Sequence, residues 1–146
     1  MAINDFVDRS LAARVEVAYP IIPKESSERV FPGGRRTYVR LVEGTFTGGN
    51  AVVLTRSFVG RSKELLARLY ACRKSPFKLA RLFGPGFILG LLLGRLSIEG
   101  LERRASAIVQ AQVAAVVVEH PELGFDVDKM EDLLLAREVF AQVSGR

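Results

Sequence analysis

The uninterrupted apolar run Ala114–Val118 limits the possible folds of this chain more than any other segment. Short apolar runs rich in β-branched residues are typical of strands that are buried on both faces of a sheet. Three other stretches also favour strands, at 15–19, 37–42 and 51–54. Because apolar residues recur at helical spacing between them, the sequence predicts an α/β sheet covered by helices. We expect one domain that spans residues 1–146.

The remaining segments divide into predicted helices and irregular stretches. The first strand is expected to end at Pro20, and 20–35 to form a loop with at most a short turn of helix. The segment 43–50 is too rich in glycine to predict regular structure. Ser97 is a favourable start for a helix, because its hydroxyl can accept a hydrogen bond from a first-turn amide. Helices are predicted over 3–11, 65–70, 77–83, 87–93, 97–109 and 130–140.

Composition excludes several classes of protein. The chain has a single cysteine, Cys72, and a single histidine, His120, so it can form neither an internal disulfide nor a zinc site of Cys and His ligands. Charged residues near the N-terminus, including Asp8 and Arg9, interrupt any signal-peptide core. The most apolar segment, 83–93, is broken by glycines and is too short to cross a bilayer. We therefore expect a cytoplasmic protein rather than a membrane-associated one.

Charge is distributed unevenly along the chain. Between Arg29 and Arg81 there are twelve basic residues against two acidic ones. Between Glu119 and Glu138 there are seven acidic residues against two basic ones. A basic stretch that faces an acidic stretch suits a metal–nucleotide site, because cations hold phosphates and carboxylates hold the metal. Two ordinary solvated faces would give the same pattern.

The strongest local motif is acidic and lies at 124–133. Asp126 and Asp128 are two residues apart in an extended segment, so both carboxylates point to the same side. Hard oxygen ligands of this kind suit Mg²⁺, and these two residues are the predicted metal ligands. The spacing leaves open, and by itself favours, the alternative that Asp128 caps the following helix with Glu131 completing a box-like arrangement.

A second motif joins a basic strand to a glycine-rich turn. Arg36 shares one strand face with Arg40, with Tyr38 between them, and its planar donors can hold a phosphate. In the turn that follows, glycines let backbone amides approach a ligand, while Thr47 and Asn50 offer side-chain donors. An ordinary turn between strands is the alternative.

Together these motifs resemble the MobA-like nucleotidyltransferase family, which includes the molybdenum-cofactor guanylyltransferase. The stretch Phe125–Leu133 is similar to the closing motif of that family, with Met130 in place of its usual proline. The stretches 20–25, 36–40 and 44–50 are similar to its acceptor-side region.

The resemblance implies a Rossmann-like, GT-A-like three-layer sandwich, Mg²⁺ as cofactor, and transfer of a nucleoside monophosphate from a nucleoside triphosphate to a small phosphate- or hydroxyl-bearing acceptor. It places Asp126 and Asp128 at the metal. Lys24 or Arg36 would hold the pyrophosphate or the acceptor phosphate. The acceptor-binding residues that it implies are Tyr38, Thr45, Thr47, Gly48, Gly49 and Asn50.

The family's first strand, with its glycine-rich nucleotide loop, has no counterpart in the sequence. We therefore expect a C-terminal portion that lacks the N-terminal nucleotide-binding strands, and that pairs with itself or with a missing N-terminal half. The main alternative function is a non-catalytic binding or regulatory module for a phosphorylated ligand. A weaker one is a membrane-surface protein that uses 77–93 with its flanking basic residues. No motif supports nucleic-acid binding.

Overall fold

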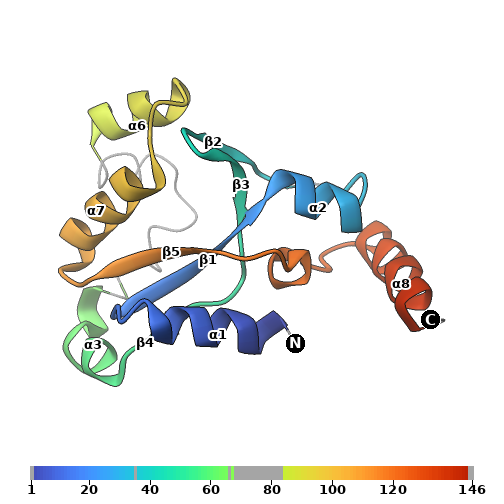
Figure 1. The fold of residues 1–146 in the computed structure, drawn as a ribbon, viewed down its shortest axis with the longest axis horizontal. Helices are drawn as coiled ribbons and strands as arrows, with labels where there is room; N and C mark the ends of the chain where they lie inside the picture. Colours follow the sequence, from blue (N-terminus) through green and yellow to red (C-terminus); the bar gives the residue numbers. More distant parts are fainter. Residues whose placement is uncertain (1, 35, 66, 68–83, 145–146) are drawn as a thin grey trace.

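The structure of the chain is a computed structural model that describes residues 2–34, 36–65, 67 and 84–144. A five-stranded sheet crosses the middle of the molecule, and helices lie on both of its faces (Figure 1). The predicted α/β class is therefore confirmed. Of the sequence predictions, the helix over 77–83 and Cys72 lie outside the described residues, as does most of the helix predicted over 65–70.

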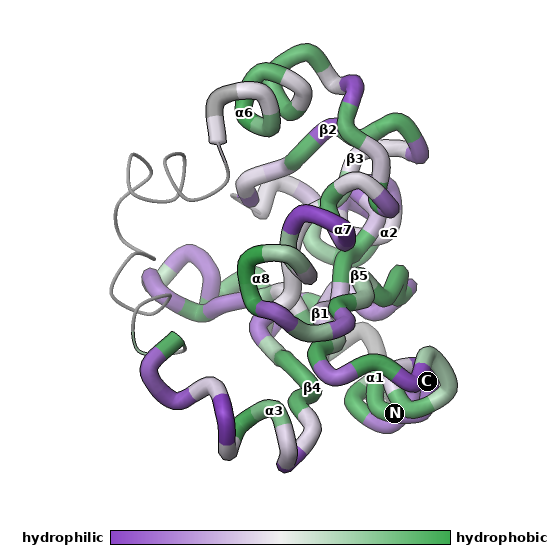
Figure 2. The backbone as a smooth tube through the Cα atoms, turned by 90° about the vertical axis from the view of Figure 1, so that its left-hand side faces the viewer, coloured by the Kyte–Doolittle hydropathy of each residue, from purple (hydrophilic) through white to green (hydrophobic). Residues whose placement is uncertain are grey.

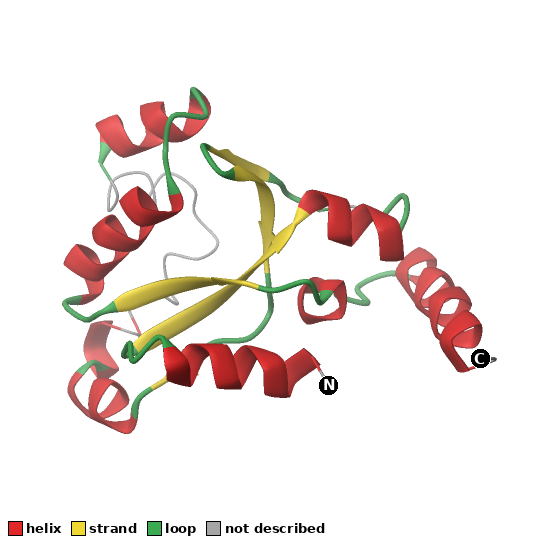
Figure 3. Cartoon of the chain, viewed as in Figure 1, coloured by secondary structure: helices red, strands yellow, loops and turns green. Residues whose placement is uncertain are grey.

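The central strand of the sheet is β1 (Val17–Pro23). Along one edge it pairs in parallel with β5 (Val113–Val117). Along the other edge it pairs antiparallel with β3 (Gly44–Gly48) and then with β4 (Val53–Leu54). Strand β2 (Val39–Leu41) adds antiparallel to β3. The sheet is therefore mixed, and Figure 3 shows its strands between the surrounding helices.

A bulge separates β3 from β4 along their shared partner β1. The pairs Ile21–Gly48 and Ala18–Val53 flank it, so that four residues, 49–52, face only two residues of β1. Extra residues in one strand of an antiparallel pair bend that strand and redirect its side chains, and such bulges are frequent beside functional sites. This bulge positions the residues that follow β3.

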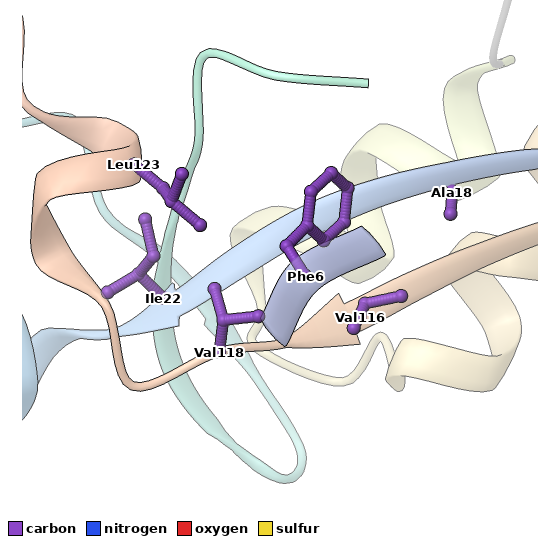
Figure 4. Packing of buried hydrophobic residues seen from close by; sticks show 6 residues of the cluster. All are labelled: Phe6, Ala18, Ile22, Val116, Val118 and Leu123. Atoms are coloured by element: carbon purple, nitrogen blue, oxygen red, sulfur yellow. The ribbon is translucent and has the colours of Figure 1, made fainter. Parts of the chain in front are cut away.

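One face of the sheet packs against α1 (Ala2–Ala12) and the short 3₁₀ helix η1 (Pro121–Gly124). The side chains of β1 alternate between the two faces, and Ile22 points to this one. It is fully buried with Phe6 of α1 and Val118, which follows β5. Figure 4 shows these side chains converging between α1, η1 and the two parallel strands.

The other face of the sheet packs against α6 (Pro85–Leu92) and α7 (Ile98–Val109). Ile21, Leu41 and Phe46 form the buried centre of this second cluster. The predicted cap of α7 is confirmed, because the Ser97 hydroxyl accepts a hydrogen bond from the backbone N–H of Gly100 at 3.0 Å. Helices on both faces complete the predicted three-layer sandwich.

Three further helices lie toward the ends of the sheet. They are α2 (Lys24–Val30), α3 (Arg56–Arg61) and α8 (Met130–Ser144). Helices α3 and η1 were not predicted from the sequence, and α2 lies where a loop was expected. Helices α2, α3 and η1 each span seven residues or fewer. They are therefore too short for apolar periodicity to become visible in the sequence.

The sheet extends further than the sequence pattern predicted. The first strand does not end at Pro20, because β1 continues to Pro23, and the glycine-rich segment 43–50 contains β3 instead of being irregular. A proline has no N–H but keeps its carbonyl, and the Pro20 carbonyl accepts a hydrogen bond from the N–H of Gly49 at 2.9 Å. Pairing on both edges of β1 thus outweighs the local signals.

Strand β5 is confirmed, but its predicted burial on both faces is wrong: within it only Val116 is buried, and Val117 is 36% exposed. Side chains of α7 satisfy part of the backbone of β5. The Glu102 carboxylate accepts a hydrogen bond from the N–H of Ala115 at 2.8 Å, and the Ser106 hydroxyl accepts one from the N–H of Val113 at 3.0 Å. Helix α7 therefore protects this edge of the sheet.

A bidentate ion pair links the start of β1 to α3. The Arg61 guanidinium donates to both carboxylate oxygens of Glu16, at 2.6 and 2.7 Å. These hydrogen bonds hold the pKa of Glu16 below its ordinary value.

None of the helices in the described ranges is long and apolar enough to cross a membrane.

Candidate functional site

A pocket of about 230 Å³ lies between the segment around Gly34 and the N-terminal end of α8. It brings together Arg36 from one predicted motif and Asp126 and Asp128 from another. The described residues that line it are Gly33, Gly34, Arg36, Phe125, Asp126, Asp128, Lys129, Glu131, Asp132 and Leu135. Four of these residues are acidic and two are basic, so the pocket favours a cation while offering a donor to an anion.

The bulge after β3 delivers Asn50 to Asp126. The Asn50 side-chain amide donates to Asp126 Oδ1 at 2.6 Å, across 76 positions of sequence. The backbone N–H of Asn50 donates to the carbonyl of Leu123 at 2.7 Å, which fixes the bulge against η1. The predicted acceptor turn and the predicted metal-side carboxylates therefore meet at one point.

The glycines beside this contact are packed too tightly to carry side chains. A Cβ atom at Gly49 would lie 2.7 Å from Cγ of Pro20, and one at Gly124 would lie 2.7 Å from Cδ1 of Ile22. At Gly48 a Cβ atom would overlap the Tyr19 ring. The structure thus gives these glycines a close-packing role, and the N–H of Gly49 is already bonded within the sheet.

Arg36 is held against an aromatic pair. Its guanidinium carbon lies 5.4 Å from the centroid of the Phe125 ring, and that ring stacks on Phe31 with 4.1 Å between centroids. Within the described part of the chain, the Arg36 Nη2 atom is buried and has no hydrogen-bond partner. A guanidinium that is fixed by stacking and still has a free donor is suited to bind an oxyanion in the pocket.

The start of α8 shows which residue caps this helix. Asp132 Oδ2 accepts hydrogen bonds from the backbone N–H of Lys129 at 2.9 Å and of Asp128 at 3.2 Å. This is the reciprocal half of a capping box, so Asp132, not Glu131, is the box residue. The capping role belongs to Asp132, and both Asp128 and Glu131 line the pocket.

Tyr19 connects the sheet to the same site. Its hydroxyl donates to the carbonyl of Gly49 at 2.7 Å. Burial raises the pKa of the Tyr19 hydroxyl, and the negative charge of Asp126 raises it further. The phenol therefore stays protonated near neutral pH and keeps the bulge in place.

The other predicted site residues do not line this pocket. Lys24 lies over the Tyr38 ring, 5.5 Å from its centroid, and pairs with Glu28 at 3.4 Å. Thr45 lies within β3, opposite Arg40. Thr47 and Gly48 line a separate apolar pocket of about 240 Å³ between the sheet and α7. The predicted acceptor turn is thus divided between two sides of the sheet.

The donors in the pocket are compatible with Mg²⁺ but do not form a complete cage. Across the described ranges there is no group of three or more His, Cys, Asp or Glu side chains that could hold a metal ion. Mg²⁺ commonly keeps several water ligands and binds through one or two carboxylates together with substrate phosphates. Asp126 and Asp128 supply such a pair of carboxylates.

Sequence reasoning missed the contributions of Phe31, Phe125, Asp132 and Tyr19. The aromatic pair is 94 positions apart in sequence, and no periodic pattern signals such a stack. Asp132 could have been found, since an acidic residue three positions after the helix cap is the usual partner in a capping box.

Among solved structures, the chain is similar to a hypothetical transferase structure from Thermus thermophilus, with 46% sequence identity and a TM-score of 0.85. The match covers 90% of this chain and 56% of the Thermus thermophilus chain. This chain therefore spans little more than half the length of that protein. No family model matches the sequence, and neither does any curated protein. With the three layers described above, the likeness supports the predicted α/β, Rossmann-like fold class.

Proposed function

We propose that this chain supplies the acceptor side and the C-terminal carboxylate side of a magnesium-dependent nucleotidyltransferase. The contact that carries the proposal is the hydrogen bond between Asn50 and Asp126. It joins the two motifs whose resemblance to MobA-like nucleotidyltransferases was independent in sequence. The likeness to a hypothetical transferase agrees with the same general class of reaction.

The reaction would join an acceptor oxygen to the α-phosphorus of a nucleoside triphosphate. A new P–O bond forms as the bond to the bridging oxygen breaks, and pyrophosphate leaves with the electron pair. Arg36 would donate to phosphate oxygens from its fixed position on Phe125. Lys24 was an alternative for this role, but it does not line the pocket, so Arg36 is the stronger candidate.

Asn50 would orient the carboxylate of Asp126, because its amide holds one of the two oxygens. The other oxygen would bind the ligand. Asp128 would provide the second carboxylate. Mg²⁺ bound there would neutralise phosphate charge. Positioning and electrostatic stabilisation, with no covalent intermediate, would then account for catalysis.

The proposal can be tested by calorimetric titration of pyrophosphate into the chain, with and without Mg²⁺. We expect binding that requires Mg²⁺ and that weakens by about tenfold or more in Asp126→Asn, Asp128→Asn and Asn50→Ala. Arg36→Met should weaken pyrophosphate binding as well, because it removes the donor. Asp8→Asn is the matched control, since Asp8 is an exposed carboxylate on α1.

Binding that is independent of Mg²⁺, or that is equally strong in Asp126→Asn, would overturn the assignment of the carboxylates. Release of pyrophosphate from each nucleoside triphosphate, measured with candidate acceptors, separates catalysis from binding. Magnesium-dependent binding with no turnover, even after addition of the expected N-terminal half, would favour the non-catalytic binding module.

A further inference from the structure

Helix α6 is apolar on every side, yet much of it is exposed. Its sequence, PGFILGLL, contains no charged residue. Leu89 is 58% exposed, Leu92 is 78% exposed, and Leu93, the residue that follows the helix, is 57% exposed. A helix that is apolar all round is normally buried in a core or in contact with lipid. This helix therefore exposes apolar side chains on its outer surface.

The exposed residues gather on one side of the helix. Gly86, Leu89 and Leu93 recur at helical spacing, and Leu92 is the i+3 neighbour of Leu89. A Cβ atom at Gly86 or at Gly90 would meet nothing within 4 Å. Leu91 points the other way, onto the cluster around Leu41. Figure 2 shows α6 as a largely apolar segment at the edge of the molecule. The fold thus anchors one side of α6 and leaves the opposite side uncovered by the described residues.

Arginines lie at both ends of α6. At the first end, Nη2 of Arg104 lies 3.3 Å from the position of a Cβ atom at Gly84. At the second end, Cδ of Arg40 lies 3.2 Å from the corresponding position at Gly94, and Arg95 is exposed beside it.

The nearby acidic side chains are largely engaged. Glu43 accepts hydrogen bonds from the N–H of Ile98, at 3.0 and 3.1 Å to its two oxygens. Glu99 pairs with Arg103 at 3.9 Å. The end of the apolar side of α6 near Gly94 therefore carries two exposed arginines, Arg40 and Arg95.

We propose that α6 docks this protein onto the surface of an anionic lipid bilayer. The leucines would lie at the boundary between headgroups and acyl chains, while Arg40 and Arg95 would contact lipid phosphates. The helix is too short to cross the membrane, so the docking is peripheral. Helices α6 and α8 lie toward opposite ends of the molecule (Figure 1), so the pocket beside α8 stays accessible in the docked protein.

Charge distinguishes a bilayer from a second copy of the chain as the partner. A symmetric pairing through α6 would bring the arginines of both copies together, and like charges oppose such a contact. An anionic surface removes that conflict. The inference is independent of the proposed transfer reaction, and either can fail without the other.

The test is co-sedimentation of the full chain with vesicles at low salt. Vesicles of phosphatidylcholine with phosphatidylserine are compared with vesicles of phosphatidylcholine alone. We expect sedimentation with the anionic vesicles that decreases as salt is added. A Leu92→Ser/Leu93→Ser variant should bind about tenfold more weakly, because two apolar anchors are lost. Arg95→Gln should weaken binding to anionic vesicles only.

The control is Leu11→Ser/Leu134→Ser, which removes two similarly exposed leucines from α1 and α8. Circular dichroism confirms that each variant is folded. Failure of anionic vesicles to sediment the wild-type chain would overturn the proposal, as would equal losses in the α6 variant and the control. Sedimentation velocity tests the second copy: a wild-type dimer that Leu92→Ser/Leu93→Ser makes monomeric, without vesicle binding, would identify α6 as a protein interface.

Discussion

Gly49 illustrates how a single residue can be required for space and not for flexibility. In the sequence it belongs to a glycine-rich turn, where glycine usually provides unusual backbone angles or access for a ligand. In the structure its backbone packs directly on the Pro20 ring and near the Leu123 carbonyl. This close approach lets Asn50 reach Asp126, so the geometry of the candidate site begins with a missing side chain.

We expect Gly49→Ala to destabilise the fold by about 1–3 kcal/mol, because the new methyl group would lie 2.7 Å from Pro20 and must displace it. Urea denaturation measures the change. Gly60→Ala in α3 is the control: nothing lies within 4 Å of that position, and alanine should be neutral or should stabilise the helix by up to about 1 kcal/mol. Equal stability of Gly49→Ala and wild type would show that the bulge relaxes.

Strand β5 and helix α7 depend on each other as elements. The carboxylate of Glu102 accepts from the N–H of Ala115, and the hydroxyl of Ser106 accepts from the N–H of Val113; both N–H groups lie on the edge of β5 away from β1. An unprotected edge of an apolar strand is a template for pairing with another chain. In the structure, α7 occupies part of this edge.

Replacing Glu102 by Ala should leave the N–H of Ala115 without its partner and cost about 1–2 kcal/mol. We also expect more self-association, which light scattering at increasing protein concentration can detect. Glu102→Gln keeps an acceptor oxygen and should behave much like wild type. Glu99→Ala, on the same helix but highly exposed, controls for loss of charge. If Glu99→Ala aggregates as readily as Glu102→Ala, edge protection is not the cause.

At the scale of the molecule, a few ion pairs among the described residues tie together segments that are distant in sequence. Glu16 is a junction of this kind: its carboxylate binds Arg61 of α3, its N–H donates to Gln112 before β5, and its carbonyl accepts from Thr55. Asp5 forms a second one, with Arg9 on α1 and His120 before η1. Hydrogen bonding from Arg9 lowers the pKa of Asp5.

The lowered pKa of Glu16 makes stability depend on pH. Its folded pKa lies below its unfolded pKa, so the stabilising contribution is complete above the unfolded value. It is lost as pH falls through the folded value. Glu16→Gln should therefore unfold at a lower temperature than wild type at neutral pH, and the difference should shrink below about pH 4. Thermal melts from pH 7 to pH 3 measure this. Glu138→Gln, an exposed change on α8, is the control. A gap that stays constant over this range would contradict the linkage.

Elements that depend on local interactions were predicted correctly from the sequence, whereas elements that depend on contacts between distant segments were missed. Helices α1, α7 and α8 were predicted because apolar spacing and a serine cap are local signals. Strand β3 was missed because its glycines argue against a strand until β1 and β2 pair with both of its edges. At the candidate site, Arg36, Asn50, Asp126 and Asp128 were predicted individually as residue types in suitable motifs.

The amino-acid sequence alone determined the α/β class and the apolar strand, and it singled out residues whose chemistry suits a metal or a phosphate, because these depend on periodicity and on side-chain chemistry. Only the tertiary structure decided which of those residues meet. The bulge opposite β1 brings Asn50 to Asp126. The stack of Phe31 on Phe125 places Arg36 in the same pocket as Asp126 and Asp128. Such contacts join segments far apart in the chain, and their formation depends on packing that no local pattern encodes.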